Sequence, residues 1–231
     1  MTAKKWVALV FCVCCALPLY AQSKEDDRMK ESYNVLRDLT ASPDKGIPGD
    51  LLQKAECVVV FPSVKKAAFV VGASYGRGVI SCRSGADFRG PWSAPAMFAL
   101  EGGSFGLQIG GQATDFVLLI MNEKGAESVM SSKVKIGADA SAAAGPVGRT
   151  TSAETDAVMS AQILSWSRAQ GAFAGVSLEG STLRSDDGAN KNVYGKELSA
   201  KEIVREGKVK TPAAGESLIQ LLEKISPKHA S

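Results

Sequence analysis

Two segments of the sequence place a serine between glycines at the spacing that many hydrolases use for a nucleophile. They are Gly72-Ala73-Ser74-Tyr75-Gly76 and Gly102-Gly103-Ser104-Phe105-Gly106. In such enzymes the serine lies on a sharp turn from a strand into a helix, and a histidine accepts its proton. Strand-like sequence follows both segments here, and the sole histidine, His229, is near the end of the chain. We therefore interpret the glycines as turn and sheet-bend positions and predict no catalytic residue.

Other residue types that carry chemistry are sparse. Cys57, Cys82 and His229 match no zinc-binding spacing, and no glycine-rich turn is followed by the Lys-Ser/Thr pair of a phosphate-binding loop. The acid pairs Asp26-Asp27 and Asp186-Asp187 lie in polar segments, so we interpret them as solvated surface and not as a glycosidase pair. The sequence predicts no metal site, no cofactor and no enzyme.

The first residues have the order of a secretory signal peptide. Lys4 and Lys5 precede an unbroken apolar run from Trp6 to Leu17, which is too short to cross a bilayer. We predict residues 1–21 as a signal peptide cut near Ala21, and residues 22–231 as one secreted or periplasmic domain. The alternative is a lipoprotein, which we favour less because bulky residues precede the candidate lipidated cysteines, Cys12 and Cys14, and Cys15 lies deep in the run.

Loss of Lys4 and Lys5 lowers the formal net charge from +3 to about +1. No global basic field then remains, so nucleic acid is not an expected partner. Two cysteines survive this processing, and an oxidising compartment would permit a disulfide between Cys57 and Cys82. We expect Cys82 on the second strand after that of Cys57, too far for a bridge, and so favour two separate buried thiols.

Hydrophobic periodicity places helices at both ends of the chain and strands between them. Residues 26–41 read as an amphipathic helix, and Pro48 falls in the first turn of a short second helix. Asn122 is a candidate cap, Ser199 and Glu202 form a capping box, and Thr211-Pro212 opens the last helix. Expected strands cover residues 57–61, 67–74, 79–83, 97–100, 116–121, 163–168 and 172–178.

Pro62 ends the first of these strands in this interpretation, Lys65-Lys66 occupy the next turn, and Gly76-Arg77-Gly78 turn a hairpin. Gly102, Gly106 and Gly110 recur every four residues, which favours a sharply bent strand. Because no helix of crossover length separates the strands, the sheet should be mainly antiparallel. The predicted fold is α+β, with a strongly curved, mainly antiparallel sheet or barrel-like core and helices at both termini.

Basic and apolar residues gather near the N-terminal helix. That helix could lie in a membrane interface with its cations against anionic headgroups, or it could pack on the sheet; its acids, including Glu25, Glu31 and Asp38, dilute the positive charge. The candidate lipid-binding residues are Arg28, Lys30, Tyr33, Leu36, Arg37, Lys65, Lys66 and Arg77.

In this order, several segments together resemble the SYLF domain family over most of residues 30–225. They are residues 47–52, 55–67, 72–78, Trp92-Ser93-Ala94-Pro95, 106–115, Gly145-Pro146-Val147-Gly148-Arg149, 171–180 and Asn192-Val193-Tyr194-Gly195. The resemblance implies a non-enzymatic domain. Eukaryotic SYLF proteins bind phosphoinositides, some fungal members bind actin, and an N-terminal amphipathic helix with nearby basic residues is implicated in lipid binding.

A signal peptide changes the partners that the resemblance implies. In a bacterial cell envelope, neither actin nor phosphoinositides are expected, so the leading hypothesis is binding to phospholipid or a membrane surface. The alternative is a structural or protein-interaction module of the envelope with no lipid ligand. An enzyme is the least favoured reading, and the sequence identifies neither the lipid, the protein partner nor the oligomeric state.

Overall fold

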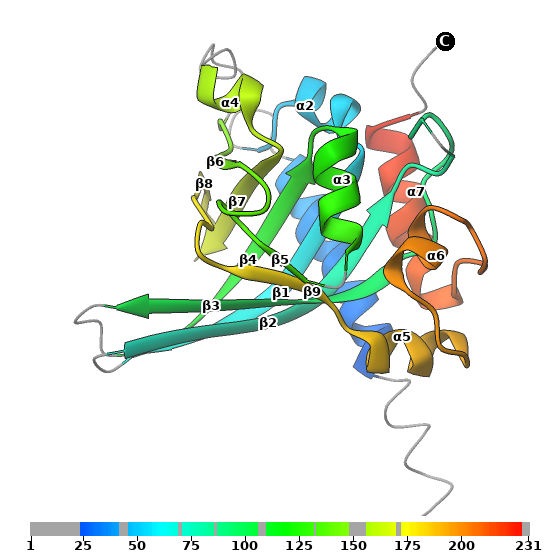
Figure 1. Ribbon diagram of the computed structural model, residues 1–231, viewed down its shortest axis with the longest axis horizontal. Coiled ribbons are helices and arrows are strands. Elements are labelled where there is room, and N and C mark those ends of the chain that lie inside the picture. The colour runs from blue at the N-terminus through cyan, green and yellow to red at the C-terminus, as the bar shows by residue number, and fades with distance from the viewer. Residues whose placement is uncertain are drawn as a thin grey trace, which may run out of the picture.

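The computed structural model describes residues 24–41, 46–68, 71–85, 87–105, 110–131, 133–147, 156–169 and 172–227. Its centre is a nine-stranded sheet with the order β5-β9-β3-β2-β1-β4-β7-β6, in which β8 pairs with β7. The sheet curls strongly, with helices packed around it (Figure 1). The predicted α+β class with a curved sheet is confirmed. The predicted signal peptide and His229 lie outside the described residues.

Four long antiparallel strands form the middle of the sheet. They are β1 (Cys57–Ala68), β2 (Val71–Cys82), β3 (Ala96–Phe105) and β4 (Gly110–Ile120). The pairing of β1 with β2 runs from Cys57↔Cys82 to Ala68↔Gly72, and β2 with β3 extends to Val71↔Phe105. In Figure 1, β2 and β3 project together well beyond the helices.

Short strands complete both edges of the sheet. They are β5 (Lys133–Lys135), β6 (Ala142–Ala144), β7 (Ile163–Ala169), β8 (Ala172–Gly175) and β9 (Thr182–Ser185). Among the described ladders only β6 with β7 is parallel, so the mainly antiparallel prediction holds. The predicted pair at residues 163–178 is observed as β7 and β8.

The described residues contain a helix in each of the five places where the sequence predicts one, and two further helices, at residues 156–160 and 187–194, that the sequence does not predict. The N-terminal helix covers residues 24–40, and the others are α2 (Gly49–Lys54), α3 (Glu123–Met130), α4 (Asp156–Ser160), α5 (Asp187–Tyr194), α6 (Ala200–Val204) and α7 (Glu216–Ile225). Asn122 caps α3 by accepting a hydrogen bond from the Gly125 amide, and Ser199 with Glu202 forms the capping box of α6. Both caps are confirmed.

Each face of the sheet carries its own apolar core. On one face, which we call the N-helix face, the N-terminal helix, α2 and α7 pack on side chains such as Val60, Val79 and Leu119. On the opposite face, α3 and α6 cover Phe98 and Leu118. The alternation of the strands therefore decides which side chains lie beside the N-terminal helix.

Pro62 does not end the first strand, contrary to the sequence interpretation. β1 continues to Ala68, and the pairing register with β4 shifts between Phe61 and Val64. Ser63 has a φ of 53°, so the chain forms a bulge beside the proline, where the missing proline N–H costs no ladder hydrogen bond. Lys65 and Lys66 consequently lie in a strand, with their side chains on opposite faces.

Gly76 and Gly78 do not turn a hairpin either; both lie inside the single strand β2. A Cβ on Gly78 would stand 2.0 Å from the Val60 carbonyl oxygen, and one on Gly76 would stand 2.4 Å from Val64 Cγ2. These glycines permit close approach of two strands, not a reversal of the chain. The same strand contains Ser74, so no strand-to-helix elbow exists there, and the segment around Ser104 likewise continues β3 to Phe105.

The expectation of separate thiols is wrong, because Cys57 and Cys82 form a disulfide. Since residues 71–82 are one strand, Cys82 lies on the direct neighbour of β1, and the two Cα atoms are 3.9 Å apart. Next to the bridge, the Arg83 amide donates to the Glu56 carbonyl, and the buried Arg83 guanidinium donates to the carbonyls of Ser226 and Pro227. The disulfide end of the sheet thus also holds the end of α7.

Candidate functional site

The N-terminal helix docks on the sheet through its apolar side. Met29, Leu36 and Leu39 are fully buried among side chains of the N-helix face. The sequence left open whether the amphipathic helix predicted at residues 26–41 lies in a membrane interface or packs on the sheet. The burial of its apolar residues shows that it packs on the sheet. Leu36 is therefore not exposed to a membrane in this structure.

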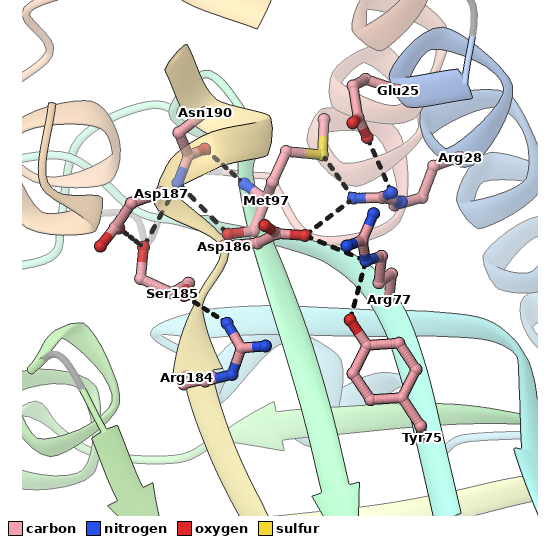
Figure 2. A network of polar contacts seen from close by, with 10 residues as sticks. All are labelled: Glu25, Arg28, Tyr75, Arg77, Met97, Arg184, Ser185, Asp186, Asp187 and Asn190. Atoms are coloured by element: carbon pink, nitrogen blue, oxygen red, sulfur yellow. Dashed lines mark hydrogen bonds and ion pairs between the residues drawn. The ribbon is translucent and has the colours of Figure 1, made fainter. Parts of the chain in front are cut away.

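A buried network of ion pairs fixes the start of this helix to the sheet (Figure 2). Arg28 pairs with Glu25 at 2.8 Å and with Asp186 at 3.6 Å, and Arg77 of β2 approaches the same Asp186 oxygen at 3.4 Å. Burial raises the pKa of Glu25 and lowers the pKa of Arg28. Because two guanidinium groups face two carboxylates, each costly buried charge has an opposite charge beside it.

Asp186 corrects the prediction of a solvated acid pair. Its side chain is buried, whereas Asp187 is exposed as predicted. Asn190 of α5 holds the region in place, since its Oδ1 accepts from the Met97 amide at 2.7 Å and its Nδ2 donates to the Met97 carbonyl. Nothing in the local sequence indicates these contacts, which arise from the return of β9 to β3.

Above this network lies a recess of about 370 Å³ between the N-terminal helix and strands β1 and β2. Its cationic lining residues are Lys24, Arg28, Lys65 and Arg77. The other lining residues are Asp27, Glu31, Pro62, Ser63, Tyr75 and Gly76. The bulge at Ser63 is part of this wall, and the Ser63 amide donates to Asp115 at 2.8 Å.

Tyr75 and Arg77 give the recess an amphipathic rim. The Tyr75 hydroxyl accepts a hydrogen bond from Arg77 Nε at 2.8 Å, and this bond raises the pKa of Arg77 further above physiological pH. Tyr75 is 41% exposed, one of the exposed large apolar side chains among the described residues. An exposed ring beside a fixed positive charge is suited to the boundary between apolar and charged phases.

A second, larger hollow of about 890 Å³ lies between α3 and the turn after β5. Glu123, Glu127 and Asp139 outnumber Lys124 in its lining, so it does not suit an anionic ligand. Within the described residues, no cluster of His, Cys, Asp and Glu is arranged to hold a metal ion. The recess beside the N-terminal helix is therefore the better candidate site for an anionic group.

A family model described as "Ysc84: Las17-binding protein actin regulator" matches residues 101–225, more than half of the sequence. The chain belongs to this family, the SYLF family. Protein YSC84 of Saccharomyces cerevisiae is 34% identical over 202 residues, which cover 84% of this chain and 42% of the yeast protein. The human SH3 domain-containing YSC84-like protein 1 is 31% identical over 206 residues, covering 87% of this chain and 59% of the human one.

LAS seventeen-binding protein 3, also of Saccharomyces cerevisiae, is 33% identical over 183 residues, which cover 78% of this chain and 39% of the yeast protein. The chain thus spans about half the length of these SYLF relatives. All lining residues of the recess precede residue 101, so the family model does not cover them. No helix among the described residues is long and apolar enough to cross a membrane.

Of the residues that the sequence predicts for lipid binding in this SYLF chain, the structure brings Arg28, Lys65 and Arg77 together at the recess. Lys24 and Tyr75 join them and were missed: Lys24 precedes the predicted helix by two residues, and Tyr75 falls between the expected strand at residues 67–74 and the expected turn at residues 76–78. A cation two residues before a predicted amphipathic helix is a signal that could have been used.

The remaining predicted residues lie elsewhere. Lys30 is exposed on the helix, and Leu36 is buried under it. Arg37 stacks on the half-buried Tyr33 ring at 5.7 Å and pairs with Asp38 at 2.8 Å. Lys66 lies on the opposite face of the sheet, 5.2 Å from the Phe116 ring.

Proposed function

We propose that this SYLF protein binds the headgroups of anionic phospholipid at the recess and that it does so without catalysing a reaction. The observation that carries the proposal is the convergence of Lys24, Arg28, Lys65 and Arg77, from the helix and two strands, on one recess. Ammonium and guanidinium groups donate charge-assisted hydrogen bonds to phosphate. Each cation near an anionic bilayer contributes about 1 kcal/mol to attachment.

The acids of the recess influence which anion suits it. Asp27 and Glu31 lie on the helical wall, so the charge inside is mixed. A single free phosphate ion would meet these carboxylates, whereas a membrane surface presents many headgroups at once to the cations on the rim. The proposal therefore concerns phospholipid in a bilayer rather than a soluble phosphate.

The proposed contact differs from insertion of the N-terminal helix. Leu36 and Met29 are buried against the sheet, and exposing them would cost roughly 1.5–3 kcal/mol each. The docked helix instead contributes its exposed polar side, which carries Lys24, while Arg28 lies buried at the base of the recess. Membrane attachment in this form leaves the fold unchanged.

We also propose that residues 22–231 act in the periplasm or outside the cell, after removal of residues 1–21. The disulfide between Cys57 and Cys82 supports this location, because such bonds persist mainly in oxidising compartments. Expression with and without the leader, followed by fractionation and mass determination, would test the cleavage near Ala21. A full-length chain found only in the cytoplasm would contradict the proposal.

Sedimentation with vesicles tests the lipid proposal. Protein comprising residues 22–231 should sediment with vesicles that contain phosphatidylglycerol at low salt, and not with vesicles of phosphatidylcholine alone. Lys24→Gln with Lys65→Gln removes two exposed cations of the recess and should weaken binding about 30-fold.

The matched control is Lys54→Gln with Lys224→Gln, two exposed lysines on α2 and α7. This pair has the same change in net charge and should bind nearly as the unaltered protein does. Absence of sedimentation by the unaltered protein at low salt, or an equal loss in both pairs, would reject a lipid site at the recess.

A protein partner is the second candidate function. It is favoured by the names of the relatives, since LAS seventeen-binding protein 3 is named for a protein that it binds. If this candidate is right, the domain immobilised on a resin should retain a defined envelope protein. It should not retain vesicles of any lipid composition. We do not expect actin as this partner in an envelope location.

A further inference from the structure

The basic recess continues into a wider band across the N-helix face of the sheet. Pairing register defines this band: Lys133 of β5 lies opposite Arg184 of β9, Arg184 opposite Ala99 of β3, and Ala99 opposite Arg77 of β2. Directly opposite residues in antiparallel strands point to the same face. Lys133, Arg184 and Arg77 therefore form one cross-strand row.

A second row runs parallel to the first, two residues further along each strand. It contains Lys135, Thr182, Glu101, Tyr75 and Lys65 in register across β5, β9, β3, β2 and β1. Measured along the curved sheet, β5 and β1 are four strand spacings apart, or about 19 Å. We call the two rows the basic band, and its cations are Lys65, Arg77, Lys133, Lys135 and Arg184.

Burial and charge distinguish the basic band from the rest of the sheet. Lys65, Lys133 and Lys135 are exposed, and the side chains of Arg77 and Arg184 are 48% and 35% exposed. Glu101 is the acid within the rows, and Arg184 pairs with it at 2.7 Å. The two rows hold five cations and one acid, whereas the whole chain has a formal net charge of only +3, so the rows are more positive than the chain as a whole.

We propose that the basic band is the surface by which the protein lies against an anionic bilayer, with the recess at one end of the contact. This inference rests on the proposed function and extends it, because it adds β5 and β9, which contribute nothing to the recess. The occupant is a bilayer rather than an acidic protein since Tyr75, an exposed amphipathic ring, lies within the rows. The sheet face, and not the apolar side of the N-terminal helix, then sets the orientation of the protein.

The test uses Lys133→Gln with Lys135→Gln, two lysines outside the recess. Because each cation near the surface contributes to attachment, this pair should weaken binding to phosphatidylglycerol vesicles about 30-fold and reduce the dependence of binding on salt. The Lys54→Gln with Lys224→Gln pair is again the charge-matched control. A cooperative thermal unfolding transition at the same midpoint temperature as that of the unaltered protein would show that the variants are folded.

The outcomes separate the two proposals. If the Lys24 and Lys65 pair weakens vesicle binding but the Lys133 and Lys135 pair does not, the basic band is refuted and the recess stands. If the unaltered protein binds no vesicle, both fail. If soluble polyglutamate competes fully with vesicles and binds as tightly as they do, the band is a surface for acidic polypeptides and the bilayer proposal is overturned.

Discussion

At the scale of single residues, Glu56 is a partly buried acid with consequences for stability. Its Oε2 atom is buried and has no hydrogen-bond partner, and burial raises the pKa of this carboxyl group to about 7, against a lowering effect of Arg83. Between about pH 4.5 and pH 7 the folded protein holds a proton that the unfolded chain has released. Stability should therefore fall as pH rises through this window.

Glu56→Gln should remove this decrease in stability with rising pH, because glutamine does not titrate. We expect the variant to exceed the unaltered protein in free energy of unfolding by about 1–2 kcal/mol at pH 8, after allowance for the partial exposure of the side chain, and to differ little near pH 4.5. Urea unfolding at several pH values measures the difference. The exposed carboxyl of Glu127 on α3 offers a control as Glu127→Gln, and a constant difference at all pH values would contradict the assignment.

At the scale of elements, strand β2 depends on two glycines that look like turn residues. A methyl group at Gly78 would clash with the Val60 carbonyl oxygen and with Phe61 Cδ1. Gly78→Ala should therefore destabilise the protein by about 3 kcal/mol or prevent folding, as overpacking of a close contact does. Gly188 of α5 has nothing within 4 Å of the added atom, so Gly188→Ala should stabilise by roughly 0.5–1 kcal/mol. Thermal unfolding of both variants measures the two changes in stability. Equal changes would contradict the proposal that Gly78 is required for the close approach of β1 and β2.

These glycines also show why part of the fold could be predicted and part could not. The caps at Asn122 and Ser199 depend on neighbours within four residues, so sequence spacing identifies them. Gly76 and Gly78 are required by contacts with Val64 and Val60, which lie on another strand. Local sequence cannot distinguish such a glycine from one in a turn. The wrongly predicted hairpin placed Cys82 two strands away from Cys57, and for that reason the disulfide was not predicted.

The candidate site was predictable to a similar extent. Arg28, Lys65 and Arg77 were selected as cations near the N-terminal helix, and the strand register places them around one recess. Asp186 was read as solvated because its neighbours are polar, yet the ion pairs that bury it come from residues 28 and 77. Pairings over such sequence separations require the sheet topology.

At the scale of the whole molecule, the disulfide joins β1 and β2 at the end that also holds α7. Its cysteines are 25 residues apart, so in the chain-entropy description the bridge should contribute about 3.5 kcal/mol. Cys57→Ala with Cys82→Ala should lose about this much free energy of unfolding in urea. Reductant should lower the stability of the unaltered protein similarly and leave the variant unaffected; a reductant-insensitive unaltered protein would be inconsistent with the bridge.

The start of the N-terminal helix lies in the wall of the recess, because Lys24 and Asp27 line it. Any polypeptide joined ahead of residue 24 consequently departs from the site itself. A retained leader or a lipid anchor would act as a tether at the very edge of the headgroup contact, and an affinity tag fused there would compete with it. The same protein, tagged at its amino end or not, would then report different affinities for the same vesicle.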